Sequence, residues 1–215
     1  MISGCIEMRL ILSGGGDPEG VVSLDELFAE QVDVDKPVLY VPVAWETANP
    51  DYEAGLKWFK RTYNPYGITD IEMCTDLCFI GGLERYTAVF IGGGNTFKLL
   101  KEIKESNFDE KLIDYLQNGG LVYGGSAGAI ICGKTIRTAA HLDHNDVGLT
   151  DLSGLNLAGG KDILCHYNRS RDDELIRKYD GGLYVLYEES GLFITDNGVT
   201  GIGKAFKTNF DIYLK

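Results

Sequence analysis

Apolar and polar positions along the chain alternate between two patterns. Short, nearly continuous apolar runs end in glycine, as in "YTAVFIGGG" and "GLVYGGS", which is typical of buried parallel strands. Between them, apolar residues recur at helical spacing. We expect strands at 8–16, 36–44, 86–94 and 120–126, and helices at 23–31, 51–63, 95–105, 108–120 and 172–180.

Strands that alternate with helices predict an α/β fold, because right-handed crossovers place helices on both faces of a parallel sheet. We therefore expect a three-layer sandwich with a mostly parallel sheet. The run "DILCH" at 162–166 predicts a further strand, and 182–206 predicts short strands with a turn at "DNG". No repeat or Pro-rich linker interrupts the chain, so we expect one domain over 1–215. Residues 1–7 are a candidate N-terminal extension ahead of a start at Met8.

Composition excludes several classes of protein. The net charge is −12, and no basic stripe is visible, which argues against a nucleic-acid partner. The apolar runs are too short for a membrane span, and the N-terminus lacks the pattern of a signal peptide. The five cysteines are odd in number and scattered, which favours reduced thiols and a cytoplasmic location. Cys74 and Cys78 lack the second ligand pair that a structural zinc site needs.

One serine stands in a motif that carries chemistry. Ser126 lies in "GGSAG", which fits Gly-x-Ser-x-Gly between a predicted strand and a predicted helix. In that context the glycines allow a cramped backbone, the hydroxyl projects outward and the helix N-terminus favours developing negative charge. The same glycines also suit a purely structural turn, so a nucleophile and a turn both remain open from the residues alone.

A serine nucleophile needs a general base and a carboxylate that orients it. His166 ends the strand "DILCH" and is expected at the same edge of the sheet as Ser126. The segment "HLDHNDVGLTD" between them supplies Asp143, Asp146 and Asp151. A rival interpretation makes His141 and His144 of this segment, with its aspartates, a metal site; a solvated loop is the third.

A second glycine-rich turn follows the strand before. In "IGGGNTFKLL", the glycines Gly92, Gly93 and Gly94 let the backbone approach a ligand closely. This motif is neither a dinucleotide-binding fingerprint nor a P-loop. A glycine N–H from this turn, paired with that of Ala127, would form an oxyanion hole.

The combination of "FIGGGNTFKLL", "YGGSAGAII", "TIRT" and a strand-ending histidine resembles the dipeptidase E (alpha-aspartyl dipeptidase) and cyanophycinase family of serine peptidases. The resemblance covers the chain from about Met8. It implies a class I glutamine-amidotransferase-like, flavodoxin-like fold. It also implies Ser126 as nucleophile, His166 as base, and Gly94 and Ala127 as the oxyanion donors.

The resemblance also implies a triad acid and substrate contacts. It favours Asp143 as the acid, with Asp146 as second choice. Arg137, Arg171 and Glu188 match substrate-binding positions, although the shorter segment after His166 weakens the prediction of aspartyl specificity.

From residues and resemblance together, we expect a cytoplasmic serine exopeptidase, acting on small peptides with a Ser-His-Asp mechanism and without a cofactor or metal. An acidic N-terminal residue is one candidate for its substrate. The expected assembly is a monomer or homodimer. The alternatives are a non-catalytic small-ligand binding protein and a metal-dependent hydrolase built on the His141–His144 loop. An esterase lacks support because no HGGG-type loop is present, and a glutamine amidotransferase would need cysteine in place of Ser126.

Overall fold

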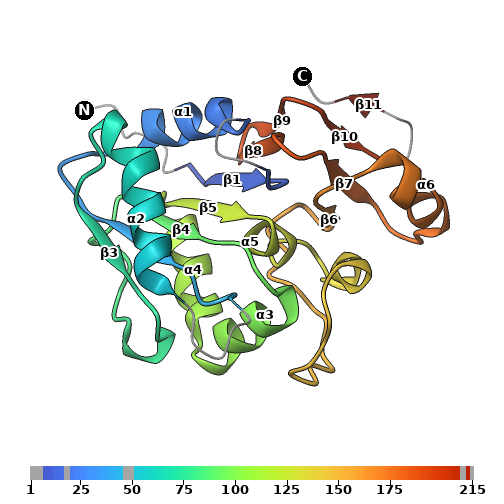
Figure 1. Cartoon of the computed structure of the whole chain (residues 1–215), viewed down its shortest axis with the longest axis horizontal. Helices are drawn as coiled ribbons and strands as arrows, with labels where there is room; N and C mark the ends of the chain where they lie inside the picture. Colours follow the sequence, from blue (N-terminus) through green and yellow to red (C-terminus); the bar gives the residue numbers. More distant parts are fainter. Residues whose placement is uncertain (1–6, 17–19, 46–50, 209–211, 214–215) are drawn as a thin grey trace.

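The structure, a computed structural model, describes residues 7–16, 20–45, 51–208 and 212–213 (Figure 1). The predicted extension at 1–7 lies almost entirely outside the described residues. Among the described residues, the helices are α1 (Val22–Gln31), α2 (Tyr52–Tyr63), α3 (Thr96–Glu105), α4 (Phe108–Gln117), α5 (Ala127–Ile130) and α6 (Arg169–Lys178). None of them combines the length and the apolar character needed to cross a lipid bilayer.

The main sheet of the described chain has seven strands in the order β3-β2-β4-β5-β1-β8-β9. Its strands are β1 (Arg9–Ser13), β2 (Val38–Val41), β3 (Ile71–Met73), β4 (Ala88–Ile91), β5 (Leu121–Gly125), β8 (Gly191–Thr195) and β9 (Gly198–Ile202). The five strands from β3 to β1 are parallel, and the β8–β9 hairpin continues the sheet antiparallel to β1. The predicted mostly parallel α/β fold is confirmed.

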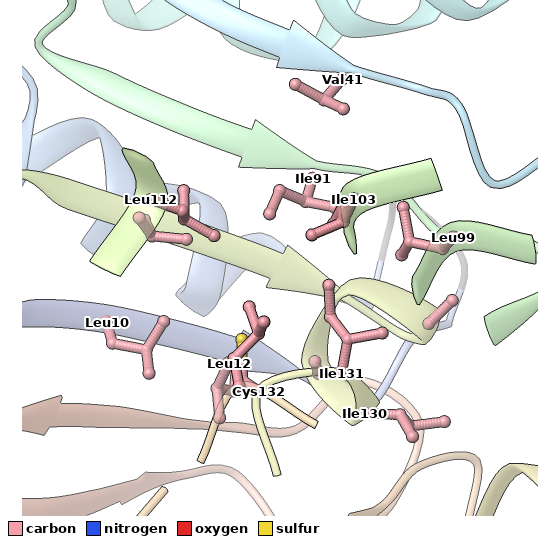
Figure 2. Close-up of a cluster of buried hydrophobic side chains, with 14 of the residues drawn as sticks. Leu10, Leu12, Val41, Ile91, Leu99, Ile103, Leu112, Ile130, Ile131 and Cys132 are labelled. Atoms are coloured by element: carbon pink, nitrogen blue, oxygen red, sulfur yellow. The ribbon is translucent and has the colours of Figure 1, made fainter. Parts of the chain in front are cut away.

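Helices cover both faces of this sheet, as the strand alternation predicts (Figure 1). Because successive strand residues point to opposite faces, Leu10 and Leu12 of β1 enter one hydrophobic cluster and Ile11 enters another. The first cluster joins β1, β4 and β5 to α3, α4 and α5 (Figure 2). The second joins the opposite face to α1 and α2 and is rich in aromatic rings. These two clusters are the interfaces between the sheet and the helices on each of its faces.

A second sheet was not predicted. It has the order β11-β10-β7-β6 within the described residues, and its strands are β6 (Asp162–Leu164), β7 (Leu183–Leu186), β10 (Ala205–Lys207) and β11 (Ile212–Tyr213). The crossover helix α6 makes β6 and β7 a parallel pair, in register from Asp162↔Leu183 to Leu164↔Val185. The sequence predicts that the tail forms short strands, but it does not predict which sheet each of these strands joins.

Capping residues set the helix boundaries. Asn95 caps α3 by accepting from the Lys98 N–H at 2.9 Å, as predicted. The predicted helix at 172–180 begins earlier, at Arg169, because the Asn168 side chain accepts from the Ser170 N–H at 3.0 Å and provides the cap.

Candidate active site

Three loops meet at the carboxyl ends of neighbouring parallel strands. They are 14–16 after β1, 92–94 after β4 and the turn after β5 that holds Ser126. The register pairs Ile91 with Gly124 and Ser13 with Gly125, so all three strands end at the same level. This edge is where open α/β sheets bind ligands.

Ser126 stands on a strained turn between β5 and α5. Its backbone has φ 50° and ψ −107°, a region that non-glycine residues rarely adopt. The flanking glycines permit close packing: a Cβ on Gly124 would lie 2.4 Å from the Gly128 carbonyl oxygen, and one on Gly128 would lie 2.6 Å from that of Ile91. The Ser126 N–H donates to the Ser13 carbonyl at 3.0 Å. The motif therefore forms the sharp strand-to-helix turn expected of a nucleophile elbow.

The structure brings Ser126 and His166 into hydrogen-bonding contact. Ser126 Oγ lies 2.8 Å from His166 Nε2, and His166 Nδ1 lies 3.1 Å from Glu188 Oε1. This serine–imidazole–carboxylate arrangement matches the geometry by which a base activates a hydroxyl and an acid orients the base. Because Leu164 pairs with Val185, continuing the register beyond β6 and β7 places His166 level with Tyr187, and Glu188 is the next residue along the chain.

The loop after β1 holds the imidazole in place. The His166 N–H donates to the Gly14 carbonyl at 3.1 Å, and the Glu189 N–H donates to that of Gly15 at 2.7 Å. Gly15 has φ +92°, and a Cβ there would lie 2.2 Å from His166 Cε1. His166 itself has φ 52° and Glu189 φ 64°, so the backbone is strained on both sides of this contact.

The structure does not bring Asp143, the predicted orienting acid, to His166. Asp143 Oδ2 instead accepts from the Thr96 N–H at 2.8 Å, at the N-terminus of α3, where a helix favours a carboxylate. Asp146, the second choice, is exposed, and no hydrogen bond of the described chain joins it to His166. The carboxylate that contacts His166 Nδ1 is that of Glu188, which the resemblance assigned to substrate binding. The signal that could have found it is the pairing of the strands before His166 and before Glu188.

Backbone donors are available beside Ser126. A Cβ on Gly93 would lie 3.2 Å from Ser126 Cβ, so the 92–94 turn passes close to the nucleophile. Gly94 has φ +139°, which glycine adopts without strain. Across the described residues, no hydrogen bond uses the N–H groups of Gly94 or Ala127. Both predicted oxyanion donors are thus unpaired, although their position relative to a substrate oxygen stays a prediction.

Two cavities flank the His166 side chain. One, of about 420 Å³, reaches Ser126 and His166 and is walled by aromatic rings. The other, of about 580 Å³, contains polar and charged side chains, among them His166, Arg171, Glu188 and Lys204. Ser126 thus borders the aromatic cavity, and His166 borders both this cavity and the polar one.

The family model described as "Peptidase family S51" matches residues 10–202. The chain belongs to peptidase family S51. Peptidase E from Escherichia coli O1:K1 / APEC and peptidase E from Shigella boydii serotype 18 are each 29% identical to it over 153 residues. Each match covers 69% of this chain but 63% of the relative, so the chain spans less than two thirds of the length of these curated relatives.

Solved structures share the fold of this S51 chain. A candidate peptidase E protein from Listeria monocytogenes EGD-e has a TM-score of 0.72 at 24% identity, over 91% of this chain and 98% of that one. A peptidase from an acI-B1 Actinobacterium has a TM-score of 0.73 at 15% identity, over 98% of this chain and 95% of that one. At these identities the likeness establishes the fold alone.

The predicted substrate arginines of the S51 chain lie away from the aromatic cavity. Arg137 pairs with Asp180 at 3.0 Å, and its guanidinium lies 5.0 Å from the centre of the Tyr179 ring. Arg171 lies on the polar cavity, where its Nε contacts Asp172 at 2.6 Å and its Nη2 donates to the His166 carbonyl at 2.6 Å.

Of the two predicted substrate arginines, Arg171 is the one that contacts His166. Burial opposes ionisation of Asp172, but hydrogen bonds from Arg171 and from the Asn168 N–H outweigh it, so the pKa of Asp172 is lowered. The Arg171–Asp172 pair is therefore ionised at neutral pH, with the arginine at the edge of the polar cavity.

The His141–His144 loop does not assemble a metal site. His141 Nδ1 contacts the Thr138 carbonyl, and the His144 carbonyl accepts from the Asn95 side chain at 2.8 Å. Asp143 is engaged at α3. Among the residues that the structure describes, no three His, Cys, Asp or Glu side chains converge as metal ligands. The loop instead packs against the start of α3, which gives the metal-hydrolase alternative no geometric support.

Proposed function

We propose that this chain is a serine peptidase that hydrolyses short peptides through Ser126, His166 and Glu188. The observation that carries the proposal is the contact of Ser126 Oγ with His166 Nε2 at 2.8 Å, on a strained turn and with a carboxylate on the far side of the imidazole. Membership in peptidase family S51 supports hydrolysis of a peptide bond rather than another acyl transfer.

In the proposed acylation, Ser126 Oγ attacks the scissile carbonyl carbon while His166 Nε2 takes the hydroxyl proton. The N–H groups of Gly94 and Ala127 stabilise the resulting oxyanion. The C–N bond then breaks as His166 returns the proton to the leaving amine. Glu188 accepts from His166 Nδ1–H throughout, which fixes the tautomer and stabilises the imidazolium.

Deacylation uses the same groups in reverse order. Water attacks the acyl-enzyme carbonyl and gives a proton to His166 Nε2, and the C–Oγ bond breaks as that proton returns to Ser126. The acyl part of the substrate would occupy the aromatic cavity at Ser126, and the leaving amine would lie toward the polar cavity, because His166 must reach its nitrogen. Arg171 is suited there to pair with a free C-terminal carboxylate, as expected for an exopeptidase on short peptides.

The test is hydrolysis of a dipeptide and tripeptide panel by the wild type, Ser126→Ala and a control, Ser23→Ala, whose side chain is exposed in α1. We expect Ser126→Ala to lower kcat/KM by at least about 10³-fold while Ser23→Ala and added chelator leave it unchanged. N-acetylated and C-amidated copies of the best peptide identify the free terminus that the enzyme requires. Turnover that survives in Ser126→Ala, or that chelator abolishes, would refute the serine mechanism.

A further inference from the structure

The cavity at Ser126 is built from aromatic rings that belong to the core on the α1–α2 face. Tyr40, Trp45, Trp58, Phe90 and Tyr123 line it. Phe90 and Tyr123 stack at 4.3 Å between ring centres, and Trp58 meets Phe90 edge-on at 6.3 Å. Its volume of about 420 Å³ falls within the range of small-molecule sites and exceeds what a short side chain would fill.

One carboxyl group lies among these rings. Asp25 of α1 lines the same cavity and is only 4% exposed. Its Oδ1 accepts from the Tyr63 hydroxyl at 2.6 Å. No donor in the described part of the chain reaches its Oδ2. Burial raises the pKa of Asp25 to about 6, although the Tyr63 hydrogen bond lowers it in part. At neutral pH this carboxyl group is therefore mostly ionised. No lysine or arginine of the described residues forms an ion pair with it.

The other charged groups of the cavity leave that charge uncompensated. Of the described residues that line it, Asp25 is the one with a carboxylate and His166 the one with an imidazole, and no lysine or arginine is among them. An aromatic cavity with a buried, unpaired carboxylate favours a cation, which gains both charge pairing and contact with ring faces. An acidic side chain would instead place two carboxylates in one cavity.

We propose that the aromatic cavity is the subsite for the side chain on the acyl side of the scissile bond, and that Asp25 makes it select lysine or arginine there. These side chains have an apolar stem, which suits the ring walls, and a cationic end, which suits the free carboxylate oxygen. The inference rests on the proposed function, since it assigns specificity to the same site. It replaces the expectation of an acidic residue at this position.

The experiment compares peptides X-Ala and X-Ala-Ala, where X is Lys, Arg, norleucine, Gln, Phe or Glu. All carry the same free α-ammonium group, so differences report the side chain. The enzymes are wild type, Asp25→Asn and Glu26→Gln, a control that removes one negative charge from the exposed face of α1. Direct binding of each peptide to Ser126→Ala, with and without Asp25→Asn, gives a readout that does not depend on turnover.

We expect wild type to prefer Lys and Arg over norleucine and Gln by about 10–100-fold in kcat/KM, the range that a charged hydrogen bond supplies. Asp25→Asn should remove most of that preference and leave norleucine and Phe turnover near wild type, and Glu26→Gln should change neither. A wild type that cleaves norleucine, Phe or Glu peptides as well as Lys peptides would overturn the subsite assignment. An equal loss for every X in Asp25→Asn would place the α-ammonium at Asp25 and also overturn it.

These failures differ from failure of the proposed function. If no peptide is cleaved by the wild type but Ser126→Ala still binds Lys and Arg peptides through Asp25, the subsite stands and the peptidase proposal fails. If peptides are cleaved without side-chain preference, the peptidase proposal stands and the subsite fails.

Discussion

Asp25→Asn should make the protein more stable at neutral pH, with a dependence on pH that identifies the cause. The pKa of Asp25 is about 6 in the folded chain, against 3.8 for an ordinary aspartate, because burial penalises the charged form. Asparagine keeps an oxygen that can accept from the Tyr63 hydroxyl, so the substitution removes the charge while preserving the hydrogen bond between α1 and α2.

The sign follows from which state loses its proton first. Between about pH 4 and pH 6 the unfolded chain has released the Asp25 proton while the folded chain retains it, so folding stability falls as pH rises through this window. A shift of about 2 pKa units corresponds to about 3 kcal/mol of stability, fully lost above pH 6. The tyrosines that act on Asp25 electrostatically, Tyr63, Tyr66 and Tyr123, have pKa values raised above 10 and stay neutral throughout.

The assay is urea unfolding of wild type, Asp25→Asn and the Glu26→Gln control at half-unit steps from pH 4 to pH 8. Subtracting the wild-type free energy of unfolding from that of Asp25→Asn removes the contributions of groups that do not interact with Asp25. We expect this difference to grow by about 2–3 kcal/mol from pH 4 to pH 7 and then to level off. A difference that stays constant over this range, or that shrinks, would refute a raised pKa at Asp25.

Two further pairs of substitutions test how the site is assembled. Glu188→Gln should lower kcat/KM by about 10²–10⁴-fold, because the imidazolium of His166 loses its carboxylate partner. Asp143→Asn should leave kcat/KM unchanged and should lower the free energy of unfolding by about 0.3–1 kcal/mol, because the charge at the start of α3 is lost. The reverse pattern of kcat/KM would return the acid role to Asp143. Gly15→Ala should lower kcat/KM at least about 10-fold, because its Cβ would meet His166 Cε1 at 2.2 Å. The control is Gly160→Ala, at φ +76° with nothing within 4 Å of the added Cβ, which should strain the backbone without lowering kcat/KM. Equal activity of the two glycine variants, with both folded by circular dichroism, would show that Gly15 does not position the imidazole.

Sequence patterns predict the main sheet well because local signals and global fold agree there. The strands β1, β4 and β5 are continuous apolar runs that lead into glycines, and Asn95 caps the helix after β4 as its position suggests. Strand β3 was not predicted, because this three-residue edge strand includes Glu72 and has no long apolar run. The turn at Ser126 is also predictable, because its glycines have a local steric role. The second sheet could not be predicted, because the residues of β6 and β7 indicate strands but carry no local signal for the strands with which they pair.

The contact of Glu188 with His166 was missed for the same reason. Asp143 and Glu188 both carry carboxylates, and the pairing of β6 with β7 is what brings Glu188 to His166. The aromatic cavity is likewise a product of packing: Asp25 belongs to an ordinary helical pattern in the sequence, and its burial against Tyr63 depends on how α1 meets α2. Nothing in the local sequence distinguishes it from a solvated acid.

The buried charge at Asp25 is most simply explained by a ligand. Packing alone does not require it, since an amide could accept the Tyr63 hydrogen bond without the cost of about 3 kcal/mol that ionisation in this cavity imposes at neutral pH. Groups that weaken folding in this way are characteristic of sites where the charge is used. A cation in the cavity would stabilise the ionised form, so bound lysine or arginine should lower the pKa of Asp25 and remove the pH-dependent loss of stability. The same carboxylate would then account both for the cost of folding the empty site and for the choice of substrate that enters it.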